Sequence, residues 1–425
     1  MFYVILWKSM QNLRNNTYEL LRKGERFFKT DTVYLAKGGF WLSFGQAIAT
    51  MSGFFVSIAF ANLFSKESFG TYKFVISMAG IVGAFSLTGI GIAITQSVAK
   101  GFESLRQGFR TNLKYGIVTL LAGLGLGSYY YANGNTLLSF SFFLMGMLLP
   151  ITASSSLYGA YLLGKKDFKS NSLYSIISNI VPATSLILAL LLAGNIWVII
   201  AVYFISGAIT SHLLYRKTLN AYRNKLPEDP ELLSYGKHLS AMDVIGRVAS
   251  YLDKVLIFHY LGAAPLAIYS FAIAPVEQLQ SGKKILSTLI LPKISERPFE
   301  ELQKTTPKKT LLLIIYALSL AGAWMIAAPY FYKLLYPQYL DSVFYSQIYS
   351  LTLLAVAGTL FNETLVAHQK RKELYFHRTV MPIIQLVLFF IMLPLYGLMG
   401  LIITHVIIRS FGGLLGYYLV KTASA

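Results

Sequence analysis

Four polar residues recur at helical spacing in the otherwise apolar stretch of residues 240–262. Asp243, Arg247, Ser250 and Lys254 follow one another at steps of four, three and four positions, so a helix places them on one face. A charged residue inside a bilayer costs about 2.5–3.5 kcal/mol on insertion scales. Such a face must border protein or water, and the stretch therefore predicts the wall of a polar cavity in a membrane protein.

The alternative interpretation of this stretch is purely structural. Asp243 and Arg247 stand four positions apart and could neutralise each other as a pair within the helix. Lys254 fits this interpretation poorly, because it lies near the middle of the span and too deep to reach the headgroups. Its neighbour Asp253 is expected to point to another side of the helix. We therefore favour a polar cavity over a structural ion pair.

The composition is that of a polytopic membrane protein. The 425 residues are 55% hydrophobic and 13% charged, whereas a soluble domain carries about 25% charged residues. The net charge is +19, but the basic residues lie in short loops, where they set topology and meet anionic lipids rather than nucleic acid. The chain has no cysteine, which excludes disulfides and thiolate metal sites.

Apolar stretches of bilayer-spanning length predict about twelve transmembrane helices and an all-α fold. Basic residues gather before the first stretch and in every second loop, which predicts that both termini are cytoplasmic. The stretches are residues 40–62, 69–97, 112–132, 136–163, 172–194, 195–215, 241–261, 265–291, 309–333, 343–367, 375–395 and 396–420.

The longest loop divides the predicted helices into two groups of six. It contains NKLPEDPELL, whose prolines and acids indicate a hinge. We expect a basic cytoplasmic or interfacial segment at 1–37, a first half at 38–215, a linker at 216–240 and a second half at 241–425. Because six is even, both halves begin in the cytoplasm, as in parallel repeats around a central cavity.

A second polar stripe in the first predicted helix supports such a repeat. At a constant offset of 197 positions, Gln46, Thr50, Gly53 and Ser57 fall opposite the four residues of the stripe at 243–254. Small polar residues are common in packed membrane helices, so a chance match is the competing explanation. We expect both stripes to face one cavity.

Three polar residues of later helices could join this cavity. Glu277 lies near mid-span beside Pro275, and a coupling-ion site and a partner of a basic residue are equally good interpretations of it. His405 and Arg409 share one helix face. For His405 we favour a packed, hydrogen-bonded residue, and the Arg409 side chain could also reach the cytoplasmic headgroups.

Two segments resemble the polysaccharide-export flippases, the Wzx-type branch of the multidrug/oligosaccharidyl-lipid/polysaccharide superfamily. They read FANLFSKESFGTYKFVISMAGIVGAFSLTGIGIAITQSVAKG in the first half and YLDKVLIFHYLGAAPLAIYSFAIA in the second. The turn LYPQY at 335–339 is also similar to that family. The likeness in layout runs from about residue 37 to the C-terminus and does not explain the basic N-terminal segment.

The resemblance implies translocation of an undecaprenyl-pyrophosphate-linked oligosaccharide, such as an O-antigen repeat unit, across a bacterial inner membrane. The substrate would move from the cytoplasmic to the periplasmic leaflet by alternating access. A doubly anionic head suits a cavity that offers Arg and Lys side chains. The candidate substrate-binding residues are Arg247, Lys254, Gln46, Thr50, Ser57 and Arg409.

The resemblance also implies transport that is driven by an ion gradient. Asp243, Asp253 and Glu277 are the candidate coupling carboxylates, with H⁺ or Na⁺ as the coupling ion and no other cofactor. The expected partners are the lipid-linked oligosaccharide, membrane lipids and other polysaccharide-assembly proteins, without nucleic acid. Two halves form the cavity within one chain, so we expect a functional monomer.

Two other functions compete with a flippase. A polysaccharide polymerase or ligase usually needs a sizeable external loop, but the predicted external loops are short, and the sequence contains no HExxH, P-loop, GxSxG or DxD motif. A drug or cation exporter of the same superfamily needs carboxylates that are not opposed by Arg and Lys. We therefore expect a transporter of an anionic lipid and not an enzyme.

Overall fold

The first half of the chain folds into a series of helices joined by short connections. The computed structural model describes residues 32–222, 227–280, 294 and 297–423. The helices of the first half are α2 (Thr32–Leu63), α3 (Lys66–Ala84), α4 (Ile90–Ala99), α5 (Leu105–Tyr115), α6 (Ile117–Ala132), α7 (Thr136–Ser155), α8 (Tyr158–Gly164), α9 (Phe168–Leu192) and α10 (Ile196–Ala221).

The second half is also helical, and the longest of its helices folds back on itself. It contains α11 (Leu232–Tyr260), α12 (Ala263–Gln280), α14 (Phe299–Leu335), η1 (Pro337–Tyr339), α15 (Ser342–Tyr349), η2 (Ser350–Val356), α16 (Thr359–Ala367) and α17 (Arg371–Thr422). Within α17, Gly397 has φ 57° and ψ −139°, a conformation that glycine adopts without steric cost. The reversal at Gly397 separates two arms of α17.

The predicted all-α membrane fold is confirmed. Where the structure describes them, the predicted spans fall mainly on helical residues, and the described residues contain no strand. Residues 281–291 of the span predicted at 265–291 lie outside the described residues. Seven of the described helices are long and apolar enough to cross a membrane by length and composition. Two predicted spans are divided among several helices: residues 69–97 form α3 and α4, and residues 343–367, which belong to one of the seven, form α15, η2 and α16. Twelve membrane crossings and two six-helix halves stay predictions.

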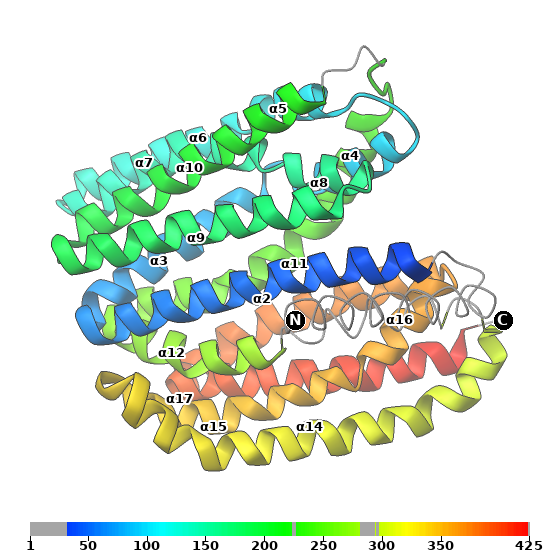
Figure 1. Ribbon diagram of the computed structural model, residues 1–425. Helices are drawn as coiled ribbons and strands as arrows, with labels where there is room; N and C mark the ends of the chain where they lie inside the picture. Colours follow the sequence, from blue (N-terminus) through cyan, green and yellow to red (C-terminus); the bar gives the residue numbers. More distant parts are fainter. Residues whose placement is uncertain (1–31, 223–226, 281–293, 295–296, 424–425) are drawn as a thin grey trace, which may run out of the picture.

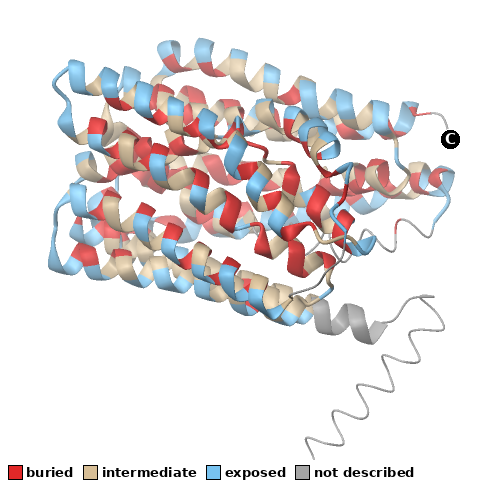
Figure 2. Ribbon diagram, turned by 90° about the horizontal axis from the view of Figure 1, so that it is seen from above, coloured by how far each residue is buried: buried red, intermediate tan, exposed pale blue. Residues whose placement is uncertain are grey.

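Helix α3 joins the helices of the first half to those of the second. It packs against α11 and α12, and the three helices are labelled in Figure 1. Buried residues lie along the faces where helices meet, and exposed residues cover the outer helix surfaces (Figure 2). Because lipid surrounds those outer surfaces, close packing between helices is what holds such a bundle together.

The crossing of α3 and α12 depends on a glycine. Ser65 caps α3 by accepting a hydrogen bond from the Ser68 backbone N–H at 3.2 Å, and Gly70 follows in the next turn. A Cβ atom at Gly70 would lie 1.8 Å from the Ala263 carbonyl oxygen. Around this contact Phe69 packs on Phe271, with ring centroids 4.6 Å apart. A side chain at position 70 would therefore force the two helices apart.

We expect Gly70→Ala to destabilise the protein by about 3 kcal/mol or more, because the clashing atom belongs to the backbone of another helix. The midpoint of thermal unfolding in detergent should fall by roughly 5 °C or more. Gly207→Ala is the control, because no atom lies within 4 Å of its added Cβ and alanine favours a helix. Unfolding of Gly70→Ala at the wild-type temperature would contradict the close crossing.

Candidate substrate cavity

A cavity of about 480 Å³ lies among α3, α11, α12 and α17. It is polar, and helices from both predicted halves line it. Its charged, histidine and tyrosine side chains are Lys73 on α3, Asp253 and Lys254 on α11, Glu277 on α12, Tyr349 on α15, and His405 and Arg409 on α17. We call it the cation cavity, because three of these side chains are basic.

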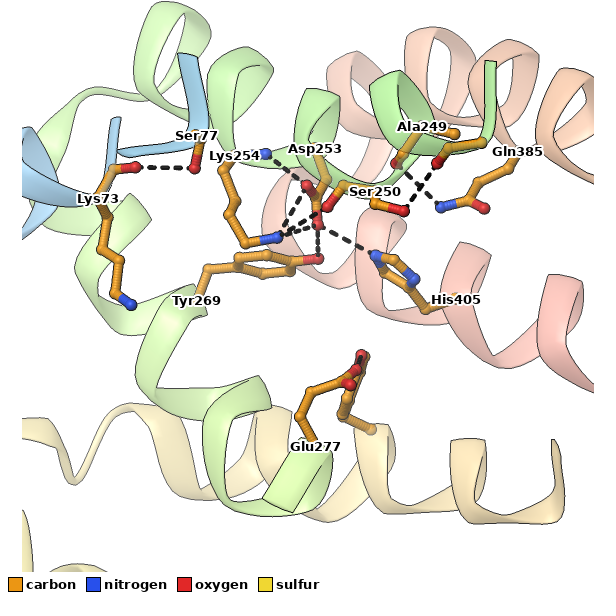
Figure 3. Close-up of polar contacts among 12 residues, drawn as sticks. Lys73, Ser77, Ala249, Ser250, Asp253, Lys254, Tyr269, Glu277, Gln385 and His405 are labelled. Atoms are coloured by element: carbon orange, nitrogen blue, oxygen red, sulfur yellow. Dashed lines mark hydrogen bonds and ion pairs between the residues drawn. The ribbon is translucent and has the colours of Figure 1, made fainter. Parts of the chain in front are cut away.

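The Asp253 carboxylate is the most deeply buried charge of the cavity wall, with 1% of its side chain exposed. The Lys254 ammonium lies 3.1 Å from Oδ1 and the Tyr269 hydroxyl donates to Oδ2 at 2.7 Å. His405 Nε2 lies 3.2 Å from the same Oδ2. Figure 3 shows these three side chains directed at the carboxylate. Such a set of partners compensates a charge that has lost its water.

The expectation that Asp253 points away from Lys254 is wrong. Neighbouring side chains leave a helix about 100° apart, but the lysine side chain has four methylene groups and folds back, so its ammonium reaches both carboxylate oxygens at 3.1 and 3.2 Å. About a fifth of the Lys254 side chain stays exposed. Lys254 therefore both neutralises Asp253 and lines the cavity.

A second ion pair joins α12 to α17. Arg409 Nη2 lies 2.6 Å from Glu277 Oε1, and its Nη1 donates to Gln280 at 2.7 Å. Tyr349 donates a hydrogen bond to the same carboxylate. The structure thus agrees with the interpretation of Glu277 as the partner of a basic residue. A role of Glu277 in ion coupling stays a prediction. Arg409 is held inside the protein, so the interpretation that it reaches headgroups is wrong.

Lys73 is the cavity residue that sequence reasoning missed as a site. Its ammonium makes no ion pair with a residue of the described ranges and lies 5.3 Å from the Phe69 ring centroid. The cation cavity thus contains the three basic side chains of Lys73, Lys254 and Arg409 and the two carboxylates of Asp253 and Glu277. A lone lysine inside the apolar stretch 69–97 was the available signal, because such a residue must find polar surroundings.

The stripe on α11 lines two adjoining cavities. A second cavity of about 510 Å³ is lined by Asp243, Arg247 and Ser250, together with residues 375–382 of α17. Ser250 also lines the cation cavity. Asp243 and Arg247 form no ion pair with each other or with other described residues, so the structural interpretation of these two residues as a pair is wrong. Their roles in binding or coupling stay predictions.

The stripe on α2 does not line either cavity. The Gln46 amide donates to Thr50 within the helix at 3.4 Å, and the Ser57 hydroxyl contacts the Tyr336 hydroxyl at 2.7 Å. Helix α2 packs closely on α9, where a Cβ at Gly45 would lie 3.3 Å from Ser172. On another side, a Cβ at Gly53 would lie 3.9 Å from the amide nitrogen of Gln278, which lines the cation cavity. The four stripe residues are not among those that line the two cavities, and substrate contacts of these residues stay predictions.

The fold is shared with solved transporters. The chain superposes on "Lipid II flippase MurJ, inward closed conformation" with a TM-score of 0.65 and 14% identity, covering 89% of this chain and 86% of that one. It superposes on "Crystal structure of MATE in complex with MaD5" with a TM-score of 0.61 and 13% identity, covering 94% and 97%. At these identities the likeness establishes the fold alone.

Sequence comparisons place the chain among polysaccharide proteins. It is 21% identical over 319 residues to a Shigella flexneri protein named "Putative O-antigen transporter", covering 67% of this chain and 72% of that protein. It is 22% identical over 287 residues to "Succinoglycan biosynthesis transport protein ExoT" of Rhizobium meliloti (strain 1021), covering 63% of this chain and 56% of that protein.

The sequence profile of the family described as "Polysaccharide biosynthesis protein" matches residues 35–298. The predicted kinship with polysaccharide-export proteins is confirmed, and because this match covers more than half of the chain, the protein belongs to the polysaccharide biosynthesis protein family.

Proposed function

We propose that this protein moves an undecaprenyl-pyrophosphate-linked oligosaccharide from the cytoplasmic to the periplasmic leaflet of a bacterial inner membrane by alternating access. The observation that carries the proposal is the cation cavity, where Lys73 has no carboxylate partner among the described residues. The names of the two relatives, an O-antigen transporter and a succinoglycan transport protein, support the same class of substrate.

The charges of the cation cavity suit a pyrophosphate. Lys73 offers an unopposed ammonium, and the Lys254 and Arg409 side chains are 19% and 24% exposed. Phosphate oxygens accept charge-assisted hydrogen bonds from such groups, and a guanidinium can donate two at once. The contacts would replace the water that a diphosphate must leave before it crosses the hydrocarbon.

The same charges disfavour the competing functions. A cation exporter would bring a positive substrate into a cavity where three cations face two carboxylates, and this excess repels it. A polymerase or ligase would need catalytic groups outside the membrane, yet the described connections at the predicted outer end are turns, such as residues 133–135 and 261–262. Both relatives are named for transport.

The contacts at the predicted outer end support alternating access. There Lys66 forms an ion pair with Asp341 at 2.8 Å, and the Asn62 amide donates to the Leu335 carbonyl at 3.0 Å. These bonds join the first half to the second. On the other side of the cation cavity, Ser250 connects it to the second cavity toward the predicted cytoplasmic end of α11. This supports a state that is closed to the periplasm.

Lys73→Ala should lower flipping of a lipid-linked oligosaccharide in reconstituted vesicles by about ten- to a hundredfold, because a hydrogen bond to a charged group contributes about 1.5–3 kcal/mol. Lys73→Arg keeps the charge and should retain most of the activity. Lys333→Ala, at an exposed position, is the matched control. If the Lys73→Ala variant flips the lipid at the wild-type rate, at equal amounts of folded protein, the role of the cation cavity is refuted.

Glu277→Gln should make flipping insensitive to imposed proton and sodium gradients, because an amide cannot take up a proton or balance a cation as a carboxylate does. Glu277→Gln leaves the Arg409 guanidinium without its carboxylate partner, and the double variant Glu277→Gln/Arg409→Gln removes that unpaired charge. The double variant should restore the amount of folded protein but not the response of flipping to the gradients. Glu301→Gln, in the exposed pair with Arg297, is the control. Gradient dependence that survives in both Glu277 variants would exclude this carboxylate.

A cross-link between positions 66 and 341 should stop transport, because opening to the periplasm requires these residues to separate. The chain has no cysteine, so Lys66→Cys/Asp341→Cys can be joined by a short, cleavable, bifunctional thiol reagent. Flipping should stop on linking and return on cleavage, while each single variant should be unaffected by the reagent. Unchanged transport by the linked protein would contradict alternating access through this end.

A further inference from the structure

A third cavity lies next to the cation cavity and has a different chemistry. It occupies about 350 Å³ between α11 and helices α3, α4, α5, α7 and α10 of the first half. We call it the Tyr251 pocket, because Tyr251 forms its wall toward α11. Resting on the function proposed above, we propose that the Tyr251 pocket binds a sugar ring of the transported oligosaccharide.

Two buried polar atoms in the Tyr251 pocket have no partner. The Asn112 side chain is 4% exposed, and its Oδ1 accepts no hydrogen bond; the Thr88 hydroxyl has no partner either. A buried polar group without a partner costs about 1–3 kcal/mol, and most such groups are satisfied in folded proteins. Both residues line the pocket, so a hydroxyl-bearing ligand inside it would offer hydrogen-bond partners to these side chains.

The two serine hydroxyls of the pocket are already bonded within the protein. Ser86 contacts the Thr119 hydroxyl at 2.8 Å, and Ser156 donates to the Ala153 carbonyl at 2.9 Å. Thr88 and Asn112 are therefore distinguished from their neighbours by their unused hydrogen-bonding capacity. An amide and a hydroxyl together can both donate to and accept from a sugar hydroxyl.

The walls of the Tyr251 pocket suit the apolar faces of a sugar ring. The Tyr251 ring lies directly against Gly80, where an added Cβ would be 2.6 Å from the ring, and Tyr203 supplies a second aromatic wall. Arg247 is the one charged residue among its lining, and it also lines the second cavity. A largely apolar interior with two aromatic side chains, one amide and a few hydroxyl groups favours an uncharged pyranose over a phosphate.

The position of the Tyr251 pocket fits a sugar that is attached to a pyrophosphate. The Lys254 ammonium of the cation cavity lies 6.0 Å from the centroid of the Tyr251 ring, so this ring separates the two cavities. A head group with its phosphates at Lys254 would bring the first sugars to the other side of the same tyrosine. One substrate would then occupy both cavities.

The test uses substitutions that remove the unpartnered atoms with little cost to folding. Thr88→Val and Asn112→Leu replace them with apolar groups of similar shape, which is neutral or stabilising when the polar group was unsatisfied. Thr359→Val is the matched control, because its hydroxyl is equally buried and unpartnered but lies on α16, outside the pocket lining. All three variants should unfold at or above the wild-type temperature.

The first measurement is binding of free glucose, galactose, N-acetylglucosamine and rhamnose to the purified protein by saturation-transfer NMR. Wild-type protein and Thr359→Val should bind at least one of these sugars, and Thr88→Val and Asn112→Leu should bind it about tenfold more weakly. If wild-type protein binds none of them, or if all variants bind equally, the pocket is structural and the proposal is overturned.

The second measurement separates this proposal from the proposed function. Vesicles are loaded either with undecaprenyl pyrophosphate or with the same lipid carrying an oligosaccharide. Thr88→Val and Asn112→Leu should slow only the sugar-bearing lipid by about tenfold, whereas Lys73→Ala should slow both. Equal slowing of both lipids by the pocket variants would overturn the sugar site. Sugar binding without transport of either lipid by wild-type protein would refute the flippase and leave the pocket assignment standing.

Discussion

The buried carboxylate of Asp253 constrains the second half of the protein. An ion in the membrane interior is tolerated only with partners, and breaking such a pair costs about 3–5 kcal/mol. Asp253 takes its partners from three helices: Lys254 on α11, Tyr269 on α12 and His405 on α17. These bonds fix the rotation of α11, α12 and α17 about their axes. The cation cavity is the space that remains between these helices and α3.

The pair of Glu277 and Arg409 repeats the constraint one turn further along α17. Because His405 and Arg409 are four residues apart, one face of α17 meets Asp253 on α11 and Glu277 on α12. Tyr349 adds α15 by its bond to Glu277. Charged side chains thereby connect the helices of the second half at two positions along α17, one at Asp253 and one at Glu277. Lys73 comes from the first half and takes no part in these ion pairs, so its contacts can change when the halves move.

Local pattern was enough to predict the helices, but not the partners of their polar residues. Hydropathy predicted helical residues in each span that the structure describes, because an apolar segment in lipid must satisfy its own backbone. The shared face of His405 and Arg409 follows from helical spacing. Their partners lie 129 to 152 positions away in the chain, and such distances cannot be deduced from a helix period. The neighbours of the α2 stripe could not be deduced for the same reason, because contacts with α9 and other helices decide which way α2 faces.

Helix α11 acts as a partition between two kinds of surface. Ser250 and Lys254, one turn apart, line the cation cavity, while Arg247 and Tyr251, also one turn apart, line the Tyr251 pocket. The centres of these two faces differ by about 60° around the helix. Each is completed by α3, through Lys73 on one side and Gly80 on the other. A ligand that fills both spaces would hold α3 against α11 and so oppose their separation. Its release must then precede or accompany any movement of the two halves apart, which makes the contact between α3 and α11 the place where substrate binding and conformational change are coupled.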